Sequence, residues 1–136
     1  MAATISPVGR GMLTIDITGV TATTDGAIGA IVNPDGVDLL VLRTILHVAT
    51  GSTGAANLTC GVAATATTAA SDIINALAVG AAATGKYYNG VVQQAAAKTE
   101  VSAPAIWSAG KYINLTGSAS SVGLVATLFV EYLRIS

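Results

Sequence analysis

The sequence predicts an all-β domain, a single jelly-roll-like β-sandwich of about eight strands over residues 1–136. Short segments rich in Val, Leu, Ile and Thr alternate with turns rich in Gly, Ser, Thr and Pro, which is typical of sandwiches. No segment keeps the periodicity of an amphipathic helix. A chain of 136 residues is long enough to bury a core as one domain, and the jelly roll is the common eight-strand sandwich.

The first predicted strand covers residues 12–18 and alternates between apolar and polar side chains. This alternation is that of a strand with one buried and one solvated face. The apolar members are Leu13, Ile15 and Ile17, and the polar members are Thr14, Asp16 and Thr18. Residues 1–10 are predicted to form an N-terminal arm, and residues 27–32 a short apolar strand.

A longer strand is predicted over residues 38–50, directly after the turn Asn33-Pro34-Asp35-Gly36. Pro34 presets φ, the Asp35 side chain can bond its own backbone, and Gly36 accepts a positive φ. Apolar residues fall on both sides of this strand, and also on both sides of the last predicted strand, residues 121–135. We therefore expect both strands to be buried on both faces, by a second sheet or by another chain.

The middle of the chain carries weaker patterns. Ser71 and Asp72 are suitable helix N-caps, so one short helical turn is predicted between Ser71 and Leu77. Residues 86–90 end in a turn signal, and residues 91–100 are polar and Ala-rich, as in a loop. Further strands are predicted over residues 57–62, after Pro104 and over residues 111–116.

The composition is unusually poor in charge. Hydrophobic residues make up 52% of the chain and charged residues 10%, against roughly 25% charged residues in an ordinary soluble domain. Since so few charges hydrate a surface poorly, we expect part of that surface to be buried in a homo-oligomer. No apolar run reaches the ~20 residues of a membrane-spanning helix, and the N-terminus does not resemble a signal peptide.

Charge and cysteine content exclude other classes. The net charge is −1 and the six Lys and Arg residues are scattered, which argues against nucleic-acid binding. Cys60 is the single cysteine, so no intrachain disulfide can form. Assembly in a reducing cytoplasm is consistent with this cysteine usage.

Candidate catalytic residues are few. His47 is the single histidine and lies in an apolar strand, and Cys60 shares the parity of apolar Leu58 and Val62. A His-based metal site needs more ligands than this, and a triad needs three matched groups. We expect a structural histidine and an inert core thiol, and predict no catalytic, cofactor-binding or metal-binding residues.

Asn33, Asp35 and Asp38 place three oxygen-bearing side chains around Gly36. Calcium loops use such residues but complete the set with a later acidic residue at the twelfth position, which is missing here. Turn chemistry explains these residues better than a calcium site does.

Trp107 and Tyr112 form an aromatic pair that could stack on a sugar ring. The alternative is that they anchor the core or an interface. The second interpretation is favoured because aromatic residues are only 4% of the chain and sugar sites usually use several.

Several stretches resemble the head decoration, or cement, proteins of tailed bacteriophages. The resemblance begins at Asn33-Pro34-Asp35-Gly36 and the strand after it, and continues through residues 49–62 and Ser71-Asp72-Ile73-Ile74-Asn75. It extends over residues 83–89, Trp107-Ser108-Ala109-Gly110-Lys111-Tyr112-Ile113 and residues 124–132. These pieces, in this order, span most of the chain after residue 30.

This resemblance implies a jelly-roll-like virion structural protein without enzymatic activity or cofactor. It implies a homotrimer on the capsid exterior that contacts the major capsid protein, with assembly in the host cytoplasm and no nucleic-acid or membrane partner. The alternative is a carbohydrate-binding jelly-roll module of a phage fibre or tail tip, with Trp107 and Tyr112 in its site.

Overall fold

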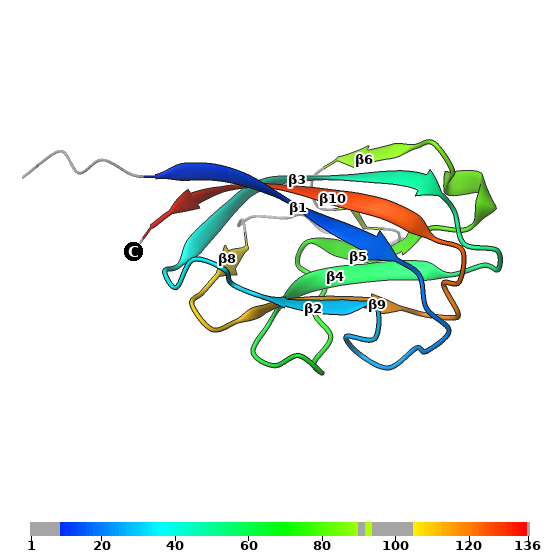
Figure 1. Ribbon diagram of the computed structural model, residues 1–136, viewed down its shortest axis with the longest axis horizontal. Coiled ribbons are helices and arrows are strands. Elements are labelled where there is room, and N and C mark those ends of the chain that lie inside the picture. The colour runs from blue at the N-terminus through cyan, green and yellow to red at the C-terminus, as the bar shows by residue number, and fades with distance from the viewer. Residues whose placement is uncertain (1–8, 90–91, 94–104, 136) are drawn as a thin grey trace, which may run out of the picture.

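Two β-sheets pack face to face in the computed structural model, which describes residues 9–89, 92–93 and 105–135 (Figure 1). Sheet A contains, in spatial order, β1 (Arg10–Thr18), β10 (Val125–Arg134), β3 (Leu39–Thr50) and β6 (Tyr87–Asn89), and β8 (Ile106–Trp107) pairs with the start of β3. Sheet B contains β2 (Gly29–Val32), β9 (Tyr112–Gly117), β4 (Asn57–Ala63), β5 (Ile74–Ala78) and β7 (Val92–Gln93).

The order of the strands is that of a jelly roll. When the two-residue strands β7 and β8 are set aside, the described residues form eight strands, and the chain crosses repeatedly between the sheets. The last strand, β10, lies between β1 and β3, and β9 lies between β2 and β4. Among the strands described, every pairing is antiparallel except that of β5 with β7. The predicted jelly-roll-like β-sandwich is therefore confirmed.

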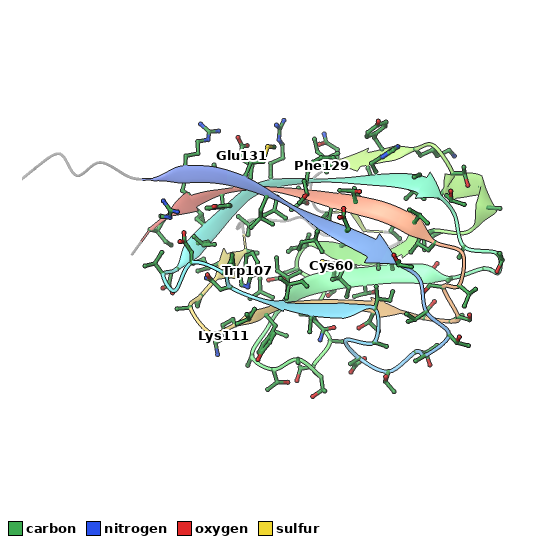
Figure 2. The ribbon with its side chains drawn as sticks, in the orientation of Figure 1. Cys60, Trp107, Lys111, Phe129 and Glu131 are labelled. Atoms are coloured by element: carbon green, nitrogen blue, oxygen red, sulfur yellow. The ribbon has the colours of Figure 1, made fainter. Side chains whose placement is uncertain are left out.

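The core fills the space between the sheets. The alternation predicted for β1 places Ile15 and Ile17 in it. Trp107 is 0% exposed, and its indole Nε1–H donates to the Lys111 carbonyl at 2.9 Å, so the polar atom is satisfied. Figure 2 shows Trp107 and Cys60 between the two sheets. The largest fully buried side chains are Trp107, Leu39, Leu46, Leu58, Ile73, Ile74, Leu77, Ile113, Leu115, Leu124, Leu128 and Val48.

A β-bulge in β3 decides which side of that strand is buried. Arg43 pairs with Glu131 and Val41 with Tyr132, so Leu42 is an extra residue opposite β10. Before the bulge Leu39 and Val41 face the core, and after it the core-facing residues are Thr44, Leu46 and Val48. Core-facing residues are odd-numbered before the bulge and even-numbered after it. One continuous face of β3 is therefore buried, while the other is exposed or half-exposed.

The prediction that β3 and β10 are buried on both faces is therefore wrong for the chain by itself. In β10, Ala126, Leu128 and Val130 are buried, whereas the residues between them are exposed or half-exposed. Apolar residues on the second face of each strand look outward, away from sheet B. The prediction also allowed for burial of this face by another chain, and that possibility stays a prediction.

The predicted helical turn between Ser71 and Leu77 is also wrong, because the chain bends at residues 72–73 and then enters β5. The Asp72 carboxylate accepts from the Val62 backbone N–H at 2.8 Å, so it binds the neighbouring strand instead of capping a helix. Ala76 has a positive φ of 54° and belongs to a bulge in β5, where Asn75 and Ala76 lie opposite Thr59 of β4. Because this bulge reverses the parity, Ile74 and Leu77 both face the core at a spacing that imitates a helix.

A single turn of 3₁₀ helix follows later, η1 (Ala81–Ala83). The predicted turn over residues 86–90 contains a short strand, β6, in which Tyr87 pairs with His47. The strands predicted over residues 12–18, 27–32, 57–62 and 111–116 are confirmed within two residues at each end. Most of the N-terminal arm (1–10) and of the loop predicted over residues 91–100 lies outside the described residues.

Candidate interaction surface

The outer surface of sheet A, which we call the open face, gathers the exposed side chains of β1, β10, β3, β6 and β8. The register places Phe129 between Thr14 and Ile45, and Glu131 between Met12 and Arg43. Figure 2 shows Phe129 and Glu131 pointing away from the core. The apolar members that alternation and exposure assign to this face are Met12, Leu40, Leu42, Ile45, Tyr87, Ile106, Val125, Phe129 and Leu133.

A charged row crosses the open face. The Arg10 guanidinium donates to Glu131 Oε2 at 2.8 Å, and Arg43 Nε lies 3.8 Å from Glu131 Oε1. Both arginine side chains are more than half exposed. Exposed pairs of this kind contribute about 0–1 kcal/mol, so the row orients side chains more than it stabilises the fold. Two cations share one carboxylate, which leaves the row able to bind a further anionic group.

Aromatic side chains occupy the two rows of the open face that follow the charged one, first Phe129 and then the His47–Tyr87 pair. The rings of His47 and Tyr87 stack with their centroids 4.2 Å apart and an interplanar angle of 17°. Tyr87 is 69% exposed, the largest exposed fraction among the exposed large hydrophobic residues of the described chain. Phe129 and Ile45 lie half-buried in the first of these rows. Aromatic side chains that present area to solvent are typical anchors of protein interfaces.

The outer surface of sheet B, the closed face, is partly covered by the chain's own loops, around Asn114. Asn114 is buried, and its amide Nδ2 donates to the Ala66 carbonyl at 2.9 Å. Its Oδ1 accepts from the Thr116 hydroxyl at 2.9 Å, and that hydroxyl accepts from the Gly26 backbone N–H at 3.0 Å. Loops around residues 26 and 66 are thereby tied to β9, and Figure 1 shows these loops beyond sheet B. This face needs no partner to satisfy its polar groups.

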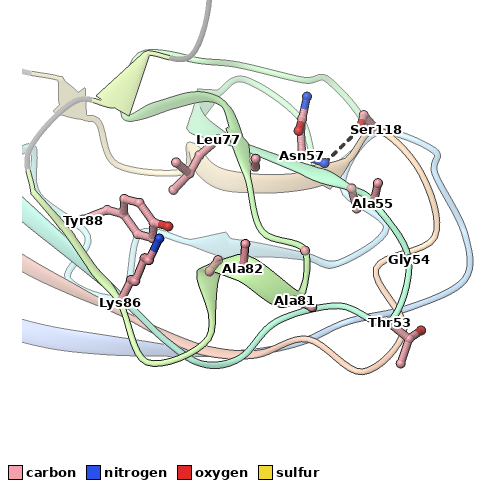
Figure 3. A pocket seen from close by; sticks show the side chains of 14 residues that line it. Thr53, Gly54, Ala55, Asn57, Leu77, Ala81, Ala82, Lys86, Tyr88 and Ser118 are labelled. Carbon is pink, nitrogen blue, oxygen red and sulfur yellow. Dashed lines mark hydrogen bonds between the residues drawn. The ribbon is translucent and has the colours of Figure 1, made fainter.

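A pocket opens at one end of the sandwich, between η1, the start of β4 and the end of β5 (Figure 3). Its volume is about 670 Å³. Most of the lining is Ala and Gly, and polar groups come from Lys86, Tyr88, Asn57, Thr53 and Ser118. The Ser118 hydroxyl is already used, since it accepts from the Asn57 backbone N–H at 2.9 Å. The lining offers one cation and no carboxylate, so it provides no acid–base pair.

The structure keeps His47 and Cys60 apart. His47 projects onto the open face, whereas Cys60 is buried in β4 within the core. Burial, and secondarily the Asp72 charge, raise the pKa of the Cys60 thiol far above its ordinary value. The predicted core thiol is confirmed; its thiolate, the reactive form, is suppressed.

Residues of the Asn33–Asp38 turn serve separate partners. The buried Asn33 amide donates to the carbonyls of Val37 at 2.8 Å and Trp107 at 2.6 Å, while its Oδ1 accepts from the Asp35 N–H at 2.8 Å. The Asp35 carboxylate forms an ion pair with Arg134, and Asp38 Oδ1 accepts from the Ala109 N–H at 3.0 Å. Gly36 has a φ of 70°, as the turn predicted. Asn33, and not Asp35, makes the bond from side chain to turn backbone.

The Trp107–Tyr112 sugar site is wrong in this form. Trp107 is fully buried, so its ring cannot stack on a sugar, and the favoured core role is the one observed. Tyr112 is half-buried on β9 in the other sheet. The aromatic residues of the open face are instead the exposed Tyr87 and the half-buried Phe129, which no sequence motif had indicated. The alternation of buried residues in β10 places Phe129 on the outer side of sheet A. The neighbouring strand β3 does not show this alternation in its sequence, because its bulge interrupts it.

Comparisons with known proteins give no relative. No protein-family model, no curated protein and no solved structure matches this chain. Among the described residues, no three or more His, Cys, Asp and Glu side chains form a group that could hold a metal ion. Within the same ranges, no helix combines the length and apolar character that a membrane crossing requires.

Proposed function

We propose that this chain is a non-enzymatic virion structural protein that self-associates, as a trimer, and decorates or stabilises the exterior of a tailed-phage capsid. The observation that carries the proposal is the open face. It is partly apolar and uncovered by the chain's own described residues, while loops cover part of the opposite surface, around Asn114. The jelly-roll order of the strands supports the same function. So does the resemblance to cement proteins, which is carried by residues 33–43, 49–62, 71–75, 83–89, 107–113 and 124–132.

The open face suits attachment that does not depend on charge. Its apolar residues extend over five strands, and its ion pairs are exposed and screened by salt. A stable interface buries roughly 800 Å² on each partner, mostly through apolar contact at its centre. The partners in this proposal are further copies of the chain and the major capsid protein.

Purified particles of a phage that encodes this chain test the proposal. The chain is expected at a copy number comparable with that of the major capsid protein, and it should remain bound in molar NaCl. Tyr87→Asp and Met12→Asp should release it, because each places a charge on the open face. Val122→Asp and Val32→Asp are matched controls, since both residues are exposed but lie elsewhere. Absence from particles, or equal loss in the controls, contradicts the proposal.

A carbohydrate-binding module remains the second candidate, with different residues from those first considered. The observation in its favour is the exposed Tyr87–His47 stack, whose outer ring is accessible to a sugar. A glycan array would show binding that Tyr87→Ala abolishes and Trp107→Phe leaves intact. Absence of any bound glycan would leave the capsid role alone.

A further inference from the structure

The first strand of sheet A has a free side. Among the described residues, β1 pairs with β10 alone and forms the edge of the sheet. The Arg134 N–H donates to the Gly9 carbonyl at 2.7 Å, and the Gly19 N–H donates to the Leu124 carbonyl at 2.8 Å. These bonds fix the alternation, so the odd-numbered residues between them direct their backbone groups toward β10. The backbone N–H and C=O groups of Arg10, Met12, Thr14, Asp16 and Thr18 therefore point outward.

This edge differs from the others in the described chain. β1 has nine residues, whereas the edge strands β2, β6, β7 and β8 have four or fewer. Proteins usually protect long edges with Lys, Pro or a bulge. β1 contains neither Lys nor Pro, and its register with β10 runs without a shift. The side chains of its outward-directed residues are all exposed. The edge is long and regular, and its charged side chains, Arg10 and Asp16, have opposite signs, so it is suited to receive another strand.

We propose that the strand it receives is β1 of a second copy, paired antiparallel about a twofold axis at Leu13. In this register Arg10 lies opposite Asp16 of the second copy, and Met12 lies opposite Thr14. The charges are self-complementary, so the symmetry produces two ion pairs at the ends of one contact. Asp16 is available for this, because within the described part of the chain its carboxylate accepts one long hydrogen bond, from the Thr127 hydroxyl at 3.5 Å. Arg10 can bind a second carboxylate through the donors that Glu131 leaves unused.

In the neighbouring register the charged residues would not lie opposite each other. With the axis at Thr14, Arg10 would face Thr18 and Asp16 would face Met12, so neither charge would meet an opposite one. Outward backbone groups pair in both registers, and the charges select the first.

Pairing of the two β1 strands would join the two copies of sheet A into one continuous sheet. A twofold axis perpendicular to the sheet keeps both open faces on the same side. The two surfaces then form one extended surface with the paired β1 strands along its middle. This contact lies at the edge of sheet A and is distinct from a trimer interface on the open face. The inference does not depend on the virion role, and in a capsid layer it would join one trimer to the next.

Cysteine pairs in the full chain test the register. Cys60 is fully buried, so introduced thiols react without interference from it. Paired residues in this geometry lie close enough for a disulfide. A mixture of Met12→Cys and Thr14→Cys proteins is expected to cross-link under mild oxidation, while neither protein cross-links alone. Cross-linking of Thr14→Cys alone would place the axis at Thr14 and overturn the proposed register. The absence of any cross-link overturns the edge pairing itself.

Charge and backbone variants provide the second test, by sedimentation at micromolar concentrations. Asp16→Arg puts like charges opposite each other twice, so the Kd of the twofold contact should rise about tenfold or more. Asp25→Arg makes the same charge change in an exposed loop and should leave the Kd unchanged. Thr14→Pro removes an outward N–H that β10 does not use, and should abolish this contact while circular dichroism stays native. Association that none of these edge variants alters would overturn the proposal, even if capsid attachment were demonstrated.

Discussion

The outer faces of the two sheets differ in how far the chain's own loops cover them, although both belong to the same charge-poor chain. On sheet B, loops around residues 26 and 66 lie over the strands, and the buried Asn114 amide ties one of them down. On sheet A, Phe129, Ile45 and Tyr87 look outward with no described segment above them. On sheet B the buried polar groups bond to the chain's own loops. On sheet A apolar side chains are exposed to solvent.

This difference explains how the composition can be tolerated. A surface with few charges must be covered by the chain's own loops or by another molecule. Sheet B takes the first solution, through side-chain bonds to loop carbonyls. Sheet A takes the second in our proposal. In that proposal the open face is the surface that a partner covers.

The sharpest test of which face is open uses neighbouring residues in β10. Leu128 is fully buried and Phe129 lies on the open face. Leu128→Ala should lower the free energy of unfolding by about 2–5 kcal/mol, because it leaves a cavity. Phe129→Ala removes more atoms but should cost only about 1 kcal/mol. Urea denaturation of both variants measures this, and equal losses would mean that Phe129 is part of a closed core.

The closed face should tolerate little added volume. A Cβ on Gly61 would meet the backbone of Ala70 and the carboxylate of Asp72, so Gly61→Ala should cost about 1–3 kcal/mol. Gly54→Ala is the control, because a Cβ there meets nothing within 4 Å. Its expected effect is within about 0.5 kcal/mol. A neutral Gly61→Ala in thermal melts would show that the loop over sheet B is not held in place.

The core between the faces should be sensitive to alkali through Cys60. Its pKa is raised on folding, so the neutral thiol is favoured in the native state. The resulting stability is complete below the ordinary thiol pKa, near pH 9, and declines as the pH rises above it. The decline should approach about 1.4 kcal/mol per pH unit. Denaturation at pH 8 and pH 10 should show a smaller loss for Cys60→Ala than for the parent chain; equal losses contradict the assignment.

The smallest expected effect concerns the charged row of the open face. Glu131→Gln removes the shared carboxylate of Arg10 and Arg43 and should change the free energy of unfolding by about 0–1 kcal/mol. The difference should vanish in molar salt, because the pairs are exposed. A loss above about 2 kcal/mol, unchanged by salt, would show that this row is structural rather than available to a partner.

Regular alternation was the part of the fold that could be predicted. β1, β4 and β9 could be predicted because, in each of them, the residues that face the core are spaced two positions apart. Bulges defeated this reasoning at Leu42 in β3 and at Ala76 in β5. An inserted residue reverses the parity, so β3 looked apolar on both sides and β5 looked helical. Such an insertion is set by tertiary pairing, and no local residue type announces it.

The candidate site was less accessible to sequence reasoning. A surface depends on which strands become neighbours, and the pairing of β10 with both β1 and β3 joins residues at least 75 positions apart, as at Thr50 and Val125. Trp107 attracted attention as the single tryptophan and proved to be core. Tyr87 lay in a segment predicted as a turn. The expectation that another chain covers part of β3 could nevertheless be formed, because apolar residues on a second face are visible in the sequence.

The position of β10 between β1 and β3 also sets the order of events during synthesis. On the ribosome, β1 and β3 emerge long before the strand that joins them, so sheet A cannot close until residues 125–134 have left the exit tunnel. Until then the apolar inner sides of both strands are available to chaperones or to other nascent chains. Long-range pairing of this kind slows folding and prolongs that exposure. Final closure by β10 therefore completes the core and creates the open face in the same step.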